Sequence, residues 1–171
     1  MDIIEVADIV NRVASGFEEA CMSCLDEHRD FVVTFIQEQL YSGVDGEEKN
    51  LSPSYDDDPF FNEAGVWHNR AKDYKEWKLK ITPPRTSNLL GLRPRLVNIP
   101  NLFIDGTFFN EITASRQGNS LFTSPGLRSG PDIVSKYGDN ILDLGPTAID
   151  YFNEHFLLPA LETFIKKCGY R

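Results

Sequence analysis

The sequence has few cysteines, no long hydrophobic run and no excess of positive charge. Its three cysteines, Cys21, Cys24 and Cys168, are an odd and sparse set among 171 residues, which argues against a disulfide framework and favours a reducing compartment. No run of about 18 apolar residues is present, so no segment is expected to span a membrane. The net charge of −9 disfavours nonspecific nucleic-acid binding by the whole surface. We therefore expect a protein that stays where it is made.

Motifs of the common enzyme classes are also missing. No serine stands in a G-x-S-x-G setting, so a hydrolase triad has no support. The glycines of residues 90–92 and 126–130 lack the strand–loop–helix context of a phosphate-binding loop. His28, His68 and His155 are scattered along the chain. We predict no catalytic residue, no cofactor and no enzymatic activity. A small enzyme whose site forms across subunits stays as an alternative.

Two short motifs are candidates for metal or redox chemistry. Cys21-Met22-Ser23-Cys24 has the C-x-x-C spacing, but a zinc site wants four ligands and no second pair follows. The three aspartates of residues 56–58 suit a hard cation, yet the mid-loop glycine and terminal glutamate of an EF-hand are missing. Core packing is the favoured interpretation for the cysteines and a solvated turn for the aspartates. We predict no metal site.

The first feature that is present is a long apolar seam in residues 1–41. Its members alternate spacings of four and three: Ile3, Ala7, Val10, Ala14, Phe17, Cys21, Cys24, His28, Phe31 and Phe35. This spacing predicts one long helix or two collinear helices, ending near Gly43. A helix of that extent would be roughly 55–60 Å long, which exceeds what a small core needs. We expect part of the seam to pack on another subunit, through Phe17 and Phe31.

Residues 42–100 predict an extended arm or loop. Six prolines interrupt this segment, and six aromatic residues are interleaved with them, a content that argues against disorder. The residues from Glu76 to Thr82 alternate enough to predict a short strand. We expect the arm to pack on a neighbour through four aromatic anchors: Phe60, Phe61, Trp67 and Trp77.

Positive charge is concentrated in one stretch of this arm. Residues 70–95 hold eight lysines and arginines against two acidic residues. Such a division of charge suits self-association between unlike surfaces, or a basic arm on an acidic partner. We expect Arg85, Arg93 and Arg95 to lie against carboxylates or along a DNA channel. The alternative is a DNA-contacting module that uses the 70–95 segment, with tryptophans available for stacking.

Residues 101–171 predict a β-hairpin followed by a C-terminal helix. Strands are expected over 108–116 and 120–124, joined by a turn at Gly118. A short helix over 133–137 with Asp132 as its cap should end at Gly138. The last helix should open near Pro146 and be kinked or divided at Pro159. The whole chain, 1–171, is thus expected to be a single α+β domain with a long N-terminal helix, an irregular arm, a small antiparallel sheet and a C-terminal helix.

The order of several motifs resembles the virion-morphogenesis (tail-completion) proteins of tailed bacteriophages. Residues 35–46 (FIQEQLYSGVDG) and 51–55 (LSPSY) resemble that family's passage from a helix into a turn and a Pro/Ser segment. Residues 101–112 (NLFIDGTFFNEI) stand where the family has a Thr-Gly strand start, with Asp105 in place of the threonine. Residues 136–138 (KYG) and 141–146 (ILDLGP) resemble its aromatic-glycine element and its lead into a C-terminal helix.

The resemblance implies a structural subunit of the virion, assembled in the host bacterial cytoplasm. Such a subunit forms a homo-oligomeric ring at the head–tail junction or tail end, as a connector or tail-completion protein. Its expected partners are copies of itself and the portal, neck or tail proteins, with genomic DNA passing through the lumen without sequence-specific binding, and no membrane. The family carries no catalytic residues.

Overall fold

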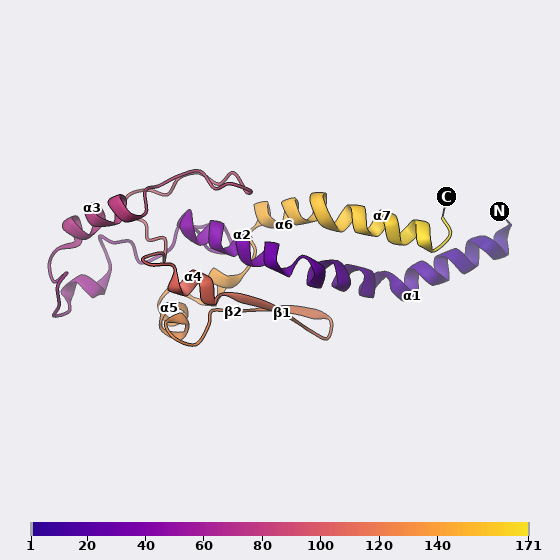
Figure 1. Cartoon of the computed structure of the whole chain (residues 1–171), viewed down its shortest axis with the longest axis horizontal. Coiled ribbons are helices and arrows are strands. Elements are labelled where there is room, and N and C mark those ends of the chain that lie inside the picture. Colours follow the sequence, from indigo (N-terminus) through magenta and orange to yellow (C-terminus); the bar gives the residue numbers. More distant parts are fainter. Residues whose placement is uncertain (1, 171) are drawn as a thin grey trace.

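The computed structural model describes residues 2–170 as an elongated α+β molecule (Figure 1). Met1, the first residue of the predicted range 1–41, and Arg171, the last residue of the predicted range 101–171, lie outside the described residues. Two helical rods form the long axis: α1 (Ile3–Glu27) with α2 (Arg29–Tyr41), and α6 (Pro146–Phe152) with α7 (Leu158–Lys167). The second rod runs alongside α1, so both ends of the chain lie at the same end of the molecule (Figure 1). The predicted fold class is confirmed.

The N-terminal helix begins at a capping box and is interrupted once. The Asp2 carboxylate accepts hydrogen bonds from the backbone amides of Ile4 and Glu5, and the Glu5 side chain accepts from the Asp2 amide. The break falls at His28, whose ring nitrogen Nδ1 lies 2.9 Å from the carbonyl oxygen of Cys24. The second helix ends before Gly43, whose φ of 73° suits glycine. The 1–41 segment is therefore two successive helices.

The 42–100 segment is mostly irregular, as predicted, but it packs on its own chain. It contains a 3₁₀ turn (Pro59–Asn62) and one helix, α3 (Ala71–Ile81). The predicted strand at Glu76–Thr82 is wrong. Short alternation cannot decide between strand and helix, whereas Tyr74, Trp77, Lys78 and Ile81 have helical spacing and the surrounding lysines are good helix formers.

The hairpin exists but is shorter than predicted. Strands β1 (Thr113–Gln117) and β2 (Ser120–Ser124) pair antiparallel around a turn in which Gly118 has a φ of 61°. The first part of the expected strand over 108–116 is instead helix α4 (Thr107–Glu111). The Asp105 carboxylate accepts from the Thr107 amide at 2.9 Å and starts this helix, and its Phe108 enters the core.

The C-terminal rod contains a proline, yet its helical turns follow one another directly from α6 to α7. Helix α5 (Gly130–Tyr137) ends at Gly138 as predicted, although Asp132 is not its cap, and a 3₁₀ turn (Asp139–Leu142) leads to α6. A π-helical turn (Asn153–Leu157) precedes Leu158 and places Pro159 in the first turn of α7, where its missing N–H is tolerated. Pro159 therefore separates two helices, one of the two predicted outcomes.

The core lies where α2 meets α4, the hairpin and the start of the C-terminal rod. Its fully buried members include Phe35, Ile36, Leu40, Ile141 and Ala148. A buried amide joins these elements: Gln39 Nε2 donates to the carbonyl of Asp143 at 3.0 Å, and Gln39 Oε1 accepts from the Gly145 amide at 2.9 Å. Both polar atoms of this side chain are therefore satisfied inside the core.

Candidate assembly interface

The apolar seam predicted along the N-terminal helix is uncovered over its first half. Ile3 is 84% exposed, Val10 58% and Phe17 46%. Ala7 and Ala14, which complete the spacing of four and three, are exposed as well. Residues with this spacing lie along one side of a helix, so they form one continuous apolar stripe. We call these five residues the α1 seam.

Other sides of α1 are covered by the chain itself. The Arg116 guanidinium of the hairpin donates to both oxygens of the Glu19 carboxylate, at 2.9 and 2.6 Å, and holds the pKa of Glu19 at about 2. On another side, Arg12 Nε donates to the Cys168 carbonyl at 2.9 Å, and Phe164 packs over Gly16. With 3.6 residues per turn, the α1 seam points away from both of these contacts.

The second half of the predicted seam is closed by the chain's own core. Cys24 is 2% exposed and Phe35 is fully buried. Phe31 stands between these states, because its ring lies 4.7 Å from that of Phe156 while 39% of the residue is exposed. Of the two interface residues predicted on this helix, Phe17 therefore lies within the uncovered stripe and Phe31 lies at the edge of the core.

The four aromatic residues predicted as anchors gather around Tyr74. Its ring centroid lies 5.3 Å from Phe61, 5.1 Å from Trp67 and 5.3 Å from Trp77. Phe61 is buried in this cluster, so its prediction as an interface residue is wrong for the chain as folded. Phe60 is 42% exposed, and both tryptophans are half-buried. These three residues therefore keep surface for a partner.

Arg95 was predicted as an interface residue but lies inside its own chain. It is 5% exposed, and its guanidinium donates to the carbonyls of Thr82 at 2.9 Å and Ile99 at 3.1 Å. Burial lowers its pKa. The prediction fails because carbonyls of an irregular segment take the place of a neighbour's carboxylates.

Lys78 is a second basic residue of this stretch that the fold buries. It is 1% exposed, and its ammonium donates to Asn101 Oδ1 at 2.7 Å and to the Phe103 carbonyl. Burial, followed by the nearby charge of Arg95, lowers the pKa of Lys78 to about 8. The two cations tie α3 and residues 82–103 together, so they belong to the folding of the segment.

The basic surface that is left is smaller than the sequence predicts. Arg70 and Lys75 are paired with Asp73 and Asp56. Four further cations are exposed, and we call them the basic surface: Lys72, Lys80, Arg85 and Arg93. Two of these, Arg85 and Arg93, are among the predicted interface residues.

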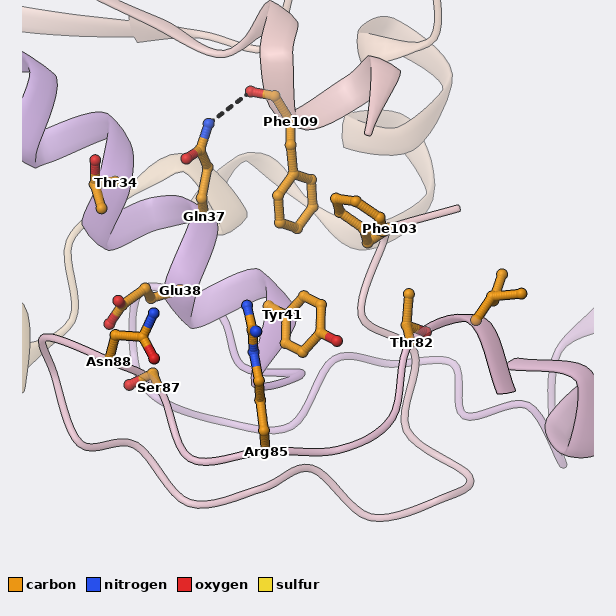
Figure 2. Close-up of a pocket in the computed structure, with 11 residues that line it drawn as sticks. Thr34, Gln37, Glu38, Tyr41, Thr82, Arg85, Ser87, Asn88, Phe103 and Phe109 are labelled. Atoms are coloured by element: carbon orange, nitrogen blue, oxygen red, sulfur yellow. Dashed lines mark hydrogen bonds between the residues drawn. The ribbon is translucent and has the colours of Figure 1, made fainter. Parts of the chain in front are cut away.

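A groove lies between α2 and residues 82–88, with a cavity of about 430 Å³ (Figure 2). The Arg85 guanidinium stands 4.7 Å from the ring of Tyr41. The Glu38 carboxylate accepts from the backbone amides of Leu89 and Leu90 at 3.0–3.1 Å. Its charge is thus engaged in holding the segment on α2, so the groove offers no free acid or base beside a nucleophile.

The carboxylates of residues 56–58 are each engaged by the protein. Asp56 pairs with Lys75, Asp57 accepts from the Ser54 hydroxyl at 2.8 Å, and Asp58 pairs with Lys136 at 2.6 Å. Across residues 2–170, no group of three or more His, Cys, Asp or Glu side chains is arranged to hold a metal ion. Asp56 and Asp58 therefore link separate segments of the chain, and Asp57 closes a local turn.

The C-x-x-C cysteines lie within α1, as the sequence predicts. Burial raises the pKa of the Cys24 thiol, whereas a nucleophilic or ligating thiolate needs a lowered pKa. Cys21 is partly exposed and both are free thiols. The environment of Cys24 is that of a core residue.

Several residues that organise the site were missed by sequence reasoning. Glu38 holds the 89–90 amides, and the Asp58–Lys136 pair joins residues far apart in sequence. Each lies in an ordinary polar stretch, and its partner is 51 or 78 residues away. The spacing of residue types within a short stretch of sequence does not indicate contacts over such separations.

Within residues 2–170, every helix is too short or too polar to cross a lipid bilayer. Comparison of the chain with protein-family models, with curated proteins and with solved structures finds no match.

Proposed function

We propose that this chain is a non-enzymatic structural subunit of a tailed-phage virion. In this proposal, copies form a homo-oligomeric ring at the head–tail junction or tail end and join the portal side to the tail side. The observation that carries the proposal is the uncovered α1 seam, because an ordered apolar stripe with heptad spacing is typical of a helix that packs on another protein.

The free-energy cost of exposing apolar surface to water supports an assembly role for this stripe. Leaving apolar surface in water costs roughly 25 cal/mol per Å². The seam exposes large residues along about four turns of α1. Its small members, Ala7 and Ala14, lie one heptad apart and leave room for close approach of a partner. A helix side that only faces solvent does not require apolar residues at this regular spacing.

The motifs that resemble those of tail-completion proteins have structural roles in this fold. Gly43, in the 35–46 motif, has a φ of 73°, and a Cβ there would lie 2.7 Å from the Ile99 side chain. In the 101–112 motif, Asp105 starts α4 and Gly106 has a φ of 87°. These positions give the motifs a structural role in this chain, and the family's function is what we propose for it.

A DNA-contacting module is the second candidate, and the basic surface favours it. Lys72, Lys80, Arg85 and Arg93 are exposed, but Trp67 and Trp77 are packed on each other at 5.5 Å, which leaves less ring surface for base stacking. A salt-dependent DNA affinity that falls with charge reversal of Lys72 and Lys80 would support this candidate.

The proposed function is tested in the phage that encodes this chain. Deletion of the gene should give separate heads and tails, and the wild-type gene supplied in trans should restore joined virions that contain the protein by mass spectrometry. Phe17→Asp should fail to restore them, whereas Phe122→Asp, on the outer face of the hairpin, should succeed. Infectious virions that lack the chain would refute the proposal.

A further inference from the structure

Two cations are buried in the described part of the chain without a counter-charge. Lys78 is 1% exposed and Arg95 is 5% exposed, and their side chains donate to carbonyl and amide oxygens. No carboxylate of residues 2–170 forms an ion pair with either cation. The charge of Arg95 helps to lower the pKa of Lys78, so the two repel each other. Buried charges are usually paired, and this part of the fold therefore holds uncompensated positive charge.

Arg95 also keeps a donor from which no described residue accepts. Its Nε atom is buried without a hydrogen-bond partner within residues 2–170, and the same holds for the Oγ atom of Ser42. The two residues are close in space, because a Cβ placed on Gly43, which follows Ser42, would lie 3.1 Å from the Cβ of Arg95. Leaving buried polar groups unpaired is costly. Two such groups in one place indicate that an acceptor is missing.

Ser42 and Arg95 both line a cavity of about 540 Å³, which lies between the end of α2 and residues 90–96. This volume is in the range of small-ligand sites. Arg93 lines the cavity as well. It is exposed, and it forms no ion pair with a described carboxylate. The cavity therefore has a free guanidinium and two unpaired donors in its wall.

The acidic residue of the lining is already engaged. The Glu48 carboxylate accepts from the backbone amide of Thr147 at 2.7 Å, at the start of α6. The lining thus holds two guanidiniums against one carboxylate, and that carboxylate has its own donor. The charge balance of the cavity favours an anion.

We propose that this cavity binds a phosphate group, with the Arg93 guanidinium, the Ser42 hydroxyl and Nε of Arg95 as donors to its oxygens. Guanidinium groups match the geometry of phosphate and carboxylate oxygens. A phosphate carries more negative charge at neutral pH than a carboxylate, which suits the two buried cations better. This inference is independent of the proposed function, because the cavity lies beyond the end of α2, away from the α1 seam (Figure 1).

The first test titrates the full chain with sodium phosphate in a calorimeter, with sodium chloride added to keep the ionic strength constant. We expect one phosphate per chain with a Kd below about 1 mM. Acetate, the carboxylate probe, should bind about tenfold more weakly or less. Glycerol 1-phosphate identifies the source of the group: tighter binding than inorganic phosphate indicates an ester and weaker binding the free ion, and both support the proposal. A chain that binds no phosphate, or that binds acetate equally well, would overturn it.

Variants locate the binding in the cavity. Arg93→Gln and Ser42→Ala should each weaken phosphate binding about tenfold, as expected for loss of a hydrogen bond to a charged group. Ser42→Ala should cost no stability in phosphate-free buffer, because the hydroxyl has no partner there within residues 2–170. The matched control is Arg85→Gln, an exposed arginine of the same segment outside this cavity, which should leave the Kd unchanged. Equal weakening by Arg93→Gln and Arg85→Gln would show a general charge effect and overturn the proposal.

Arg95 is tested without substitution, because its bonds to Thr82 and Ile99 hold the segment together. In NMR spectra of the wild-type chain, the Nε–H proton of Arg95 should shift downfield when phosphate is added, since it then has an acceptor. The Nε–H proton of Arg85 in the same sample is the control and should not move. An Arg95 signal that stays in place while phosphate is bound would place the anion elsewhere and contradict the proposal.

Discussion

Phe17→Asp is the most informative perturbation of the α1 seam. Phe17 lies in the middle of α1, 46% exposed, with the other half of its surface covered by its own chain. Aspartate removes the apolar ring and places a charge where the partner is expected to dock. We expect a folded chain that no longer self-associates.

The magnitude follows from the exposed half of the ring. A phenylalanine buries about 200 Å² when fully covered, so the exposed fraction of Phe17 leaves about 90 Å² for a partner. At roughly 25 cal/mol per Å² this area contributes about 2 kcal/mol, or about a 30-fold change in Kd. Desolvation of the unpaired carboxylate adds to this loss. The Kd of self-association should therefore rise by roughly 30-fold or more.

The matched control is Phe122→Asp. Phe122 is 51% exposed on β2, so the same substitution removes a similar amount of the chain's own packing. Urea unfolding should show comparable losses of stability for both variants, of about 2 kcal/mol. Sedimentation velocity should show loss of association for Phe17→Asp alone.

Two results would refute this reasoning. If Phe17→Asp associates as tightly as the wild type, the α1 seam is not an interface. If it destabilises the single chain far more than Phe122→Asp does, Phe17 belongs to the core of its own chain and is not a docking residue.

Three other predictions concern the single chain. Cys21→Ala with Cys24→Ala should fold and assemble at a cost on the order of 1–2 kcal/mol per buried site, and metal analysis that finds one zinc per wild-type chain would contradict it. Burial lowers the pKa of Lys78 to about 8 in the folded chain, from an ordinary value of 10.5. Between about pH 8 and 10.5 the unfolded chain therefore binds more protons than the folded chain. The free energy of unfolding should rise with pH across this window, by up to about 3 kcal/mol. Urea unfolding should show this rise in the wild type relative to Lys78→Met, and parallel pH profiles would contradict it. Glu38→Ala should leave the amides of residues 89–90 without their acceptor and cost about 1–3 kcal/mol, with faster hydrogen exchange confined to residues 84–95; unchanged exchange there would show that other contacts hold the segment.

The N-terminal helix shows how far sequence periodicity reaches. Spacing identifies which residues share one side of a helix, but the residues of α1 that the chain buries are Ile9 and Met22, which lie off the predicted seam, and Cys24, which lies on it. It does not show where the side is covered, because the cover comes from Phe156 and other residues more than a hundred positions away. The division of the seam into an uncovered and a buried half required the tertiary structure.

The arm shows why burial of charge could not be predicted. Lysine and arginine are usually exposed, so residues 70–95 appear in the sequence as one basic face. Lys78 and Arg95 can be buried because the carbonyl oxygens of residues 82, 99 and 103 and the amide oxygen of Asn101 accept their hydrogen bonds. These acceptors lie in irregular backbone, which periodicity does not describe.

The same contacts correct the expectation that the arm packs only on a neighbour. Tyr55 donates its backbone amide to the Asn98 carbonyl at 2.8 Å, and Glu38 holds residues 89–90. Proline excluded a regular ladder, as predicted, but side chains from α2 and turns within the segment supply the missing hydrogen bonds. The part of the arm left for a partner is its surface.

The proposed function requires that copies of this chain form a ring at the head–tail junction or tail end. Cryo-electron microscopy of the virion that encodes the chain tests it most directly. We expect a ring of identical subunits there, each contributing an α1 helix to the contact with its neighbour. A junction and tail end whose density is fully explained by other proteins would contradict it.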